Sequence, residues 1–200
     1  MSVLEEEDKD MAGKTIEIRW HARGGQGAKS AAIMVAEVAL EEGKFGQGCP
    51  DYGPERRGAP TRGYTRISDS AIVAHCAIAT PDVVVVLDET LIGPTQVCEG
   101  MKAGGSVLVN TSKSPSEIRQ KLGLKEGKVY TIDATQVSME TIGRPIPNTP
   151  MIGALIKATG VLKLDTILHD VEKKFGRKGA KIVQGNKDAI RRAYEEVKCE

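Results

Sequence analysis

The chain has 200 residues, the length of one domain of ordinary size. Its 28 lysines and arginines nearly balance its 27 aspartates and glutamates, so the formal net charge is only +1. Proteins that coat nucleic acid or anionic membranes carry a surplus of positive charge, so this balance argues against both partners. Aromatic residues make up only 4% of the chain, which leaves few stacking platforms for single-stranded nucleic acid.

The sequence carries no sign of a membrane or secretory protein. No apolar run approaches the roughly 20 residues that span a bilayer, and residues 1–14 are acidic and polar rather than signal-like. We predict a flexible tail over 1–14 and a single domain over 15–200. The four cysteines lie far apart, without the C-x-x-C pairs typical of zinc or iron–sulfur sites. We therefore expect no metal in this chain and a cytoplasmic location, because scattered free cysteines suit a reducing compartment.

The first half of the chain begins like a βαβ unit. Alternating residues predict a strand over 15–22, and the spacing of apolar residues predicts a helix over 28–42. The stretch 45–63 is rich in glycine, proline and charge and has no core periodicity, which predicts a long loop. Two short strands over 64–67 and 72–78 are predicted to form a hairpin.

The second half alternates aliphatic runs with helical spacing, which predicts an α/β fold with a mostly parallel sheet between helices. One helix start is explicit, because Ser114, Pro115 and Glu117 match a capping box with proline at the first helical position. The predicted strands cover 82–87, 106–109 and 129–132, and the other predicted helices cover 93–101, 135–142, 149–159, 165–175 and 186–197.

The glycines at 24, 25 and 27 lie in the loop between the first predicted strand and the first predicted helix. Glycines at this place let backbone N–H groups approach an anion, and the helix N-terminus adds partial positive charge. Lys29 favours a bound phosphate, because a cation in the first helical turn opposes the helix dipole unless an anion offsets it. The nicotinamide fingerprint lacks its third glycine, where Ser30 stands, and no Walker A motif is present. A tight turn without a ligand remains the alternative.

A basic loop over 54–63 places Arg56, Arg57 and Arg62 between glycines and prolines. These neighbours make the loop thin and stiff, so the guanidinium groups could bind phosphate oxygens in a bidentate manner. The loop is expected beside the glycine loop at the carboxyl end of the sheet, where open α/β sheets bind ligands. The alternative is an ordinary solvated surface loop.

Other polar residues are weaker candidates. His21 lies at a strand end without a nucleophile or metal-ligand spacing, which is typical of a hydrogen-bonded structural histidine. Asp88 and Glu89 follow a buried strand and are either a carboxylate pair or a helix N-cap. Asn148 is either the N-cap of the next helix or a polar arm that reaches a ligand. No catalytic triad or self-sufficient catalytic set emerges.

With both loops in view, the chain resembles the gamma subunits of the 2-oxoacid:ferredoxin oxidoreductases, the pyruvate synthase group in particular. The resemblance runs from about residue 15 to the C-terminus, and the combination of G-G-Q-G with E-R-R-G-A-P is specific. The matching segments are IEIRWHARGGQGAKSA (16–31), YGPERRGAPTRGYTRIS (52–68), PDVVVVLDETL (81–91) and GRPIPNTPMIGALIKATG (143–160).

The resemblance implies a Rossmann-like three-layer domain within a multi-subunit oxidoreductase. In that family the complex oxidatively decarboxylates a 2-oxoacid, expected here to be pyruvate, forms acyl-coenzyme A and CO2, and passes electrons to ferredoxin; the reverse synthase reaction is also implied. Thiamine diphosphate with magnesium and [4Fe–4S] clusters are implied in the alpha, beta and delta partner subunits, not in this chain.

The resemblance also implies that this chain supplies part of the coenzyme A site, with no catalytic or metal-ligating residue of its own. A non-catalytic structural or assembly subunit, and a binding module for another phosphorylated ligand, are the alternatives. The implied coenzyme A contacts are Gly24, Gly25, Gln26, Gly27, Ala28, Lys29, Arg56, Arg57, Arg144 and Asn148.

Overall fold

A computed structural model describes residues 15–51 and 57–200. Within these residues a seven-stranded sheet runs in the order β2-β3-β1-β4-β5-β6-β7. The strands are β1 (Thr15–Arg23), β2 (Phe45–Pro50), β3 (Pro60–Ser68), β4 (Val83–Val86), β5 (Ser106–Asn110), β6 (Lys128–Ile132) and β7 (Lys198–Cys199). The helices are α2 (Ala28–Glu41), α3 (Pro115–Leu122), α4 (Ala134–Ile142), α5 (Asn148–Thr159), α6 (Leu164–Phe175) and α7 (Ala180–Glu196), with 3-10 turns η1 (Glu89–Leu91) and η2 (Gly176–Lys178).

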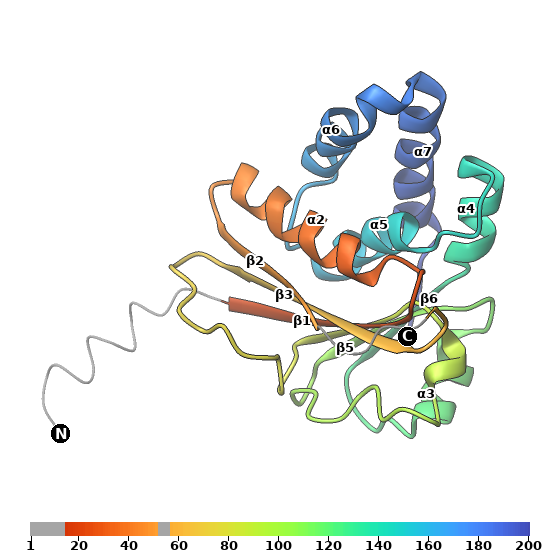
Figure 1. Cartoon of the computed structure of the whole chain (residues 1–200). Coiled ribbons are helices and arrows are strands. Elements are labelled where there is room, and N and C mark those ends of the chain that lie inside the picture. Colours follow the sequence, from red (N-terminus) through yellow and green to blue (C-terminus); the bar gives the residue numbers. More distant parts are fainter. Residues whose placement is uncertain (1–14, 52–56) are drawn as a thin grey trace, which may run out of the picture.

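The centre of the sheet is parallel. β1, β4, β5 and β6 pair in parallel, while β3 lies antiparallel between β1 and β2, and β7 is antiparallel to β6. The four valines of β4 are buried, as expected for a strand covered on both faces. Figure 1 shows α2 and α4 to α7 on one face of the sheet and α3 on the other, so the predicted α/β fold with helices on both sides is confirmed.

The topology brings the loops that follow the parallel strands to one edge of the sheet. The carboxyl ends of parallel strands always lie together, and ligands of open α/β sheets bind there. In this protein the glycine loop follows β1, η1 follows β4, and further loops follow β5 and β6 at the same edge.

Three predicted elements are wrong. The predicted loop over 45–63 contains β2 and the start of β3. The glycines of β2 hide its strand pattern, yet they are needed there: a Cβ on Gly46 would overlap the carbonyl oxygen of Ala36 in α2. The predicted strand over 72–78 and the predicted helix over 93–101 are irregular segments instead.

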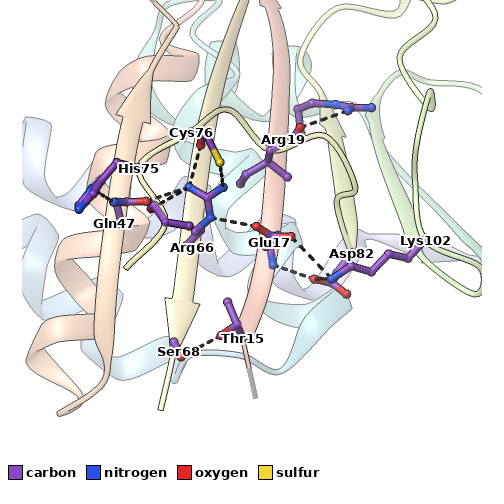
Figure 2. Close-up of polar contacts among 12 residues, drawn as sticks. Thr15, Glu17, Arg19, Gln47, Arg66, Ser68, His75, Cys76, Asp82 and Lys102 are labelled. Atoms are coloured by element: carbon purple, nitrogen blue, oxygen red, sulfur yellow. Dashed lines mark hydrogen bonds and ion pairs between the residues drawn. The ribbon is translucent and has the colours of Figure 1, made fainter. Parts of the chain in front are cut away.

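Side-chain hydrogen bonds explain the first of these irregular segments. The buried guanidinium of Arg66 on β3 donates to the carbonyls of Ala74 and Cys76 at 3.4 and 2.9 Å, so this backbone is held by a side chain instead of a neighbouring strand. Figure 2 shows the same guanidinium joined to Glu17 and Gln47. The antiparallel partners of β3 are therefore β1 and β2.

Arg19, which is 6% exposed on β1, holds both irregular segments. Its guanidinium donates to Ile78 O at 3.4 Å, to the neighbouring Ala79 O at 3.2 Å and to Val97 O at 3.0 Å, and its Nε donates to His21 Nε2 at 3.1 Å. Positive φ values at Gly93 and Gly100, near the two ends of the helix predicted over 93–101, are also incompatible with helical backbone at these positions. His21 is therefore a hydrogen-bonded structural histidine, as predicted.

The other predicted helices and strands are present, with shifted ends. α7 begins at Ala180, ahead of the predicted start at residue 186. The capping box is confirmed, because Ser114 accepts from the backbone of Glu117 and the Glu117 side chain accepts from the backbone of Ser114.

The buried His21 makes the stability of the fold depend on pH. Burial, helped by the positive charges of Arg19 and Arg62, lowers the pKa of His21 from 6.5 to about 3. Below pH 6.5, His21 is therefore protonated in the unfolded chain, whereas in the folded chain it stays neutral until the pH falls to about 3. The stability from this group is complete above pH 6.5 and is lost as the pH falls toward 3, by about 1.4 kcal/mol per pH unit.

We expect His21→Gln, which keeps an acceptor for Arg19, to remove this part of the acid destabilisation. Urea unfolding at a series of pH values measures it as the difference in the free energy of unfolding between variant and parent. An identical pH dependence in the two proteins would contradict the buried neutral histidine.

Candidate functional site

The glycine loop connects β1 to the N-terminus of α2. Gly25 and Gly27 have φ values of +100° and +83°, in the left-handed region that favours glycine. Gly27 is the N-cap residue of α2; no side chain caps this helix, and its first turn holds no acidic residue. The positive end of the α2 dipole is therefore not offset by a carboxylate of its own helix.

A second helix N-terminus meets the first at Gly27. Asn148, the first residue of α5, lies so close that a Cβ on Gly27 would stand 2.5 Å from Asn148 Nδ2. The same Nδ2 donates to the Gly27 carbonyl at 3.5 Å, and within the described residues the buried Asn148 Oδ1 has no hydrogen-bond partner. α5 also has no side-chain cap and no acid in its first turn. Two uncompensated positive helix ends therefore converge, a geometry that attracts an anion.

The described part of the basic loop, residues 57–63, lies against the glycine loop, as predicted. Gly24 N donates to Ala59 O at 2.8 Å, and Gly58 N donates back to Gly24 O at 3.1 Å. Arg23, at the end of β1, adds a third link from its Nη1 to Gly58 O at 3.1 Å. The two loops thus form one structural unit at the carboxyl end of β1.

The remaining predicted site residues differ in burial and in their distance along the chain from the glycine loop. Ala28 is buried and Lys29 is half-buried in the first turn of α2, whereas Arg57 is exposed on the basic loop. Arg56 lies outside the described residues. Arg144 is exposed in the turn between α4 and α5, and no hydrogen bond or ion pair among the described residues joins its side chain to either loop.

Sequence reasoning missed the part of the site that Asp88 and Arg23 form. Asp88 caps η1 through Thr90 N at 3.0 Å, so the N-cap interpretation is confirmed, but its other oxygen also accepts from Gln26 at 2.7 Å. Burial opposes ionisation of Asp88, yet the hydrogen bonds from Thr90 and Gln26 outweigh burial and lower the pKa of this carboxyl. Its position in the sequence could have revealed this role, because Asp88 follows β4, the strand that pairs with β1.

A polar cavity of about 300 Å³ adjoins the glycine loop at the ends of β4, β5 and β6. Carboxylates in its wall disfavour phosphate. An anion therefore fits the N-termini of α2 and α5 at Gly27 and Asn148, the paired helix ends, better than this cavity. The lining residues are Gln26, Leu87, Asp88, Glu89, Asn110, Thr111, Ser112, Asp133 and Thr135.

Neither metal-binding nor membrane-spanning features are found in the part of the chain that the structure describes. Residues 15–51 and 57–200 contain no group of three or more His, Cys, Asp or Glu side chains arranged to hold a metal ion. Among the same residues, every helix is too short or too polar to cross a bilayer.

Comparison with known proteins places the chain in a family of redox enzymes. Residues 17–196 match the pyruvate ferredoxin/flavodoxin oxidoreductase family, and the chain belongs to it. Over 190 residues it is 50% identical to pyruvate synthase subunit PorC of Thermotoga maritima, covering 94% of this chain and 98% of that protein. It is 47% identical to the pyruvate/ketoisovalerate oxidoreductases common subunit gamma of Thermococcus kodakarensis, covering 84% of this chain and 94% of that protein.

Solved structures agree with the sequence comparisons. The crystal structure of the Thermotoga maritima subunit PORC matches with a TM-score of 0.85 and 49% identity over 94% of this chain and 99% of that one. The gamma subunit of a keto/oxoacid ferredoxin oxidoreductase from Geobacter sulfurreducens matches with a TM-score of 0.73 and 25% identity, over 92% of this chain and 96% of that one. The predicted resemblance to the gamma subunits of these oxidoreductases is confirmed.

Two glycine variants test the contact between the helix ends. Gly25→Ala and Gly27→Ala both place a side chain at positive φ, which costs about 1 kcal/mol each. A Cβ at Gly25 meets nothing within 4 Å, whereas one at Gly27 meets Asn148. We expect Gly27→Ala to lower the free energy of unfolding by about 1–2 kcal/mol more than Gly25→Ala, because the Asn148 side chain must move away and lose its hydrogen bond to the Gly27 carbonyl. Urea denaturation measures both, and equal losses would disprove the close approach.

Proposed function

We propose that the chain is the gamma subunit of a pyruvate:ferredoxin oxidoreductase and supplies the phosphate-binding part of its coenzyme A site. In this proposal the complex converts pyruvate and coenzyme A to acetyl-coenzyme A and CO2 and passes the electrons to ferredoxin. The similarity to subunits named for pyruvate synthase over nearly the whole chain supports the choice of complex. Thiamine diphosphate and the iron–sulfur clusters are assigned to the alpha, beta and delta partners.

The observation that carries the coenzyme A assignment is the meeting of α2 and α5 at Gly27 and Asn148. Coenzyme A has its phosphates on the nucleotide side and its reactive thiol at the far end of a flexible arm. Backbone N–H groups and two helix dipoles suit the phosphates without any charged side chain. Arg57, exposed on the adjoining basic loop, adds positive charge at the same edge of the sheet.

This division of labour assigns the chain a positioning role. Phosphates held at the paired helix ends leave the thiol arm free to extend toward the acyl group in the partner subunits. Holding two reactants together converts an encounter in solution into a local reaction, with effective molarities that reach about 10⁵ M or more for well-oriented groups. No side chain of this subunit then needs to take part in bond making or breaking.

An added carboxylate at the helix ends tests the proposal. Asn148→Asp places a negative charge beside two positive helix termini, but it also replaces the Nδ2 donor to the Gly27 carbonyl with an acceptor, so we expect no net gain in the stability of the free chain. The same charge repels phosphate, so the KM for coenzyme A of the assembled oxidoreductase should rise at least about tenfold. The turnover number at saturating coenzyme A should stay unchanged. Thermal unfolding and steady-state kinetics provide the two measurements.

Ser116→Asp is the matched control, because it adds a carboxylate to the exposed first turn of another helix, α3, and the one hydrogen bond described for the Ser116 side chain is to Ser114 and not to the glycine loop. Its KM for coenzyme A should equal that of the parent. An unchanged KM in Asn148→Asp would instead mean that the paired helix ends serve structure or assembly, and would remove the coenzyme A assignment.

A further inference from the structure

We propose that Asp88 is a positioning residue that holds the glycine loop and the described part of the basic loop, around Gly58, in their binding arrangement. For the identity of the ligand this inference rests on the proposed function. The carboxylate does not lie on the phosphate-binding surface itself: it acts through Gln26 and Arg23, whose side chains connect it to the two loops.

Strand pairing brings Asp88 to this position. β4 pairs in parallel with β1, with Val86 opposite His21, and the next residue continues the pairing because Leu87 N donates to His21 O at 2.8 Å. Asp88 is therefore the first residue beyond the paired part of β4. It faces the loop that leaves β1.

One oxygen of Asp88 fixes the glycine loop. Oδ2 accepts from Gln26 Nε2 at 2.7 Å, and the Oε1 atom of the same amide accepts from Arg23 N at 2.8 Å. Gln26 N also donates to Arg23 O at 3.1 Å. The Gln26 side chain is thus held at both of its polar atoms, and the loop is folded back onto the end of β1.

The other oxygen orients the arginine that reaches the basic loop. Oδ1 accepts from Thr90 N at 3.0 Å and from Thr90 Oγ1 at 2.6 Å. Thr90 Oγ1 in turn accepts from Arg23 Nε and Nη2 at 3.0 and 2.8 Å. Arg23 Nη1 is then directed to the carbonyl of Gly58.

The ionised carboxylate is the group that this network requires. Its two oxygens accept three hydrogen bonds, Oδ2 lies 3.5 Å from Arg23 Nε, and the side chain is only 17% exposed. Charge-assisted hydrogen bonds away from bulk water are stronger than neutral ones. An asparagine would present its NH2 group to the NH2 of Gln26 or to the N–H of Thr90, and it would leave Arg23 without a counter-charge.

The adjacent Glu89 offers a matched control. It has a similar half-buried setting, but it accepts from Lys113 Nζ at 3.0 Å and from Thr111 Oγ1, both in the loop after β5. Glu89→Gln therefore disturbs the same kind of network one residue away without a contact to the glycine loop.

The test compares Asp88→Asn and Glu89→Gln in the assembled oxidoreductase. Loss of hydrogen bonds to a charged group predicts a rise of about tenfold in the KM for coenzyme A for Asp88→Asn, with the turnover number at saturating coenzyme A unchanged. Glu89→Gln should leave this KM within about twofold of the parent. In the free chain, hydrogen exchange at Gly24 to Gly27 should speed up only in Asp88→Asn.

A second variant separates the positioning role from the cap. Asp88→Ser keeps an N-cap oxygen for Thr90 but cannot reach Gln26, so the same rise in KM is expected with little loss of η1. In a Gln26→Ala background, Asp88→Asn should raise the KM by less than about threefold, because the part of its effect that passes through Gln26 is already lost and only the part through Thr90 and Arg23 remains.

The outcomes distinguish this inference from the function on which it rests. An unchanged KM in Asp88→Asn and Asp88→Ser, with a raised KM in Asn148→Asp, overturns the inference alone. An unchanged KM in all three overturns the proposed function as well. Lower stability and turnover at an unchanged KM would identify Asp88 as a structural cap and overturn its positioning role.

Discussion

The buried guanidinium of Arg19 is the interaction on which the arrangement of the sheet depends. It lies on the face of β1 opposite α2 and donates to backbone carbonyls of two irregular segments and to His21. A buried charge is costly unless it is hydrogen-bonded, and here carbonyl dipoles satisfy it. Burial, with Arg62 nearby, lowers the pKa of Arg19. On this face of β1, irregular segments that are hydrogen-bonded to Arg19 cover the strand in place of a helix. The same hydrogen bonds connect β1, which leads into the glycine loop, to these segments.

The second face of the sheet is therefore divided into two chemically different halves. Over β4 and β5 it is an aliphatic cluster that packs against Ile118 of α3 and Leu91 of η1. Over β1 and β3 it is a polar network, in which Arg66 pairs with Glu17 at 2.9 Å and Lys102 joins Asp82 at the strand entrance (Figure 2). Both halves limit the movement of the strands, so the loops at the carboxyl edge start from fixed points. A binding site built from loops needs such a rigid support.

The candidate site takes its positive potential mainly from the backbone. The N-termini of α2 and α5 converge at Gly27, and neither helix has a side-chain cap or an acidic residue in its first turn. This explains how a chain with a formal net charge of +1 can offer an anion site, because helix dipoles do not enter the count of charged residues. In the proposed function, this subunit contributes the geometry of the anion site, and the redox chemistry is assigned to its partners.

The sequence by itself determined the elements whose signals are local. β1, the glycine loop, α2, β4 and the capping box at Ser114 follow from periodicity, glycine placement and caps, which involve residues close in the chain. Only the tertiary structure decided that Asn148 meets Gly27, that Asp88 holds Gln26, and that β2 is a strand. These features depend on residues far apart in the sequence. Parallel pairing brings the strand ends together, and the irregular segments take their shape from buried arginines that no local pattern reveals.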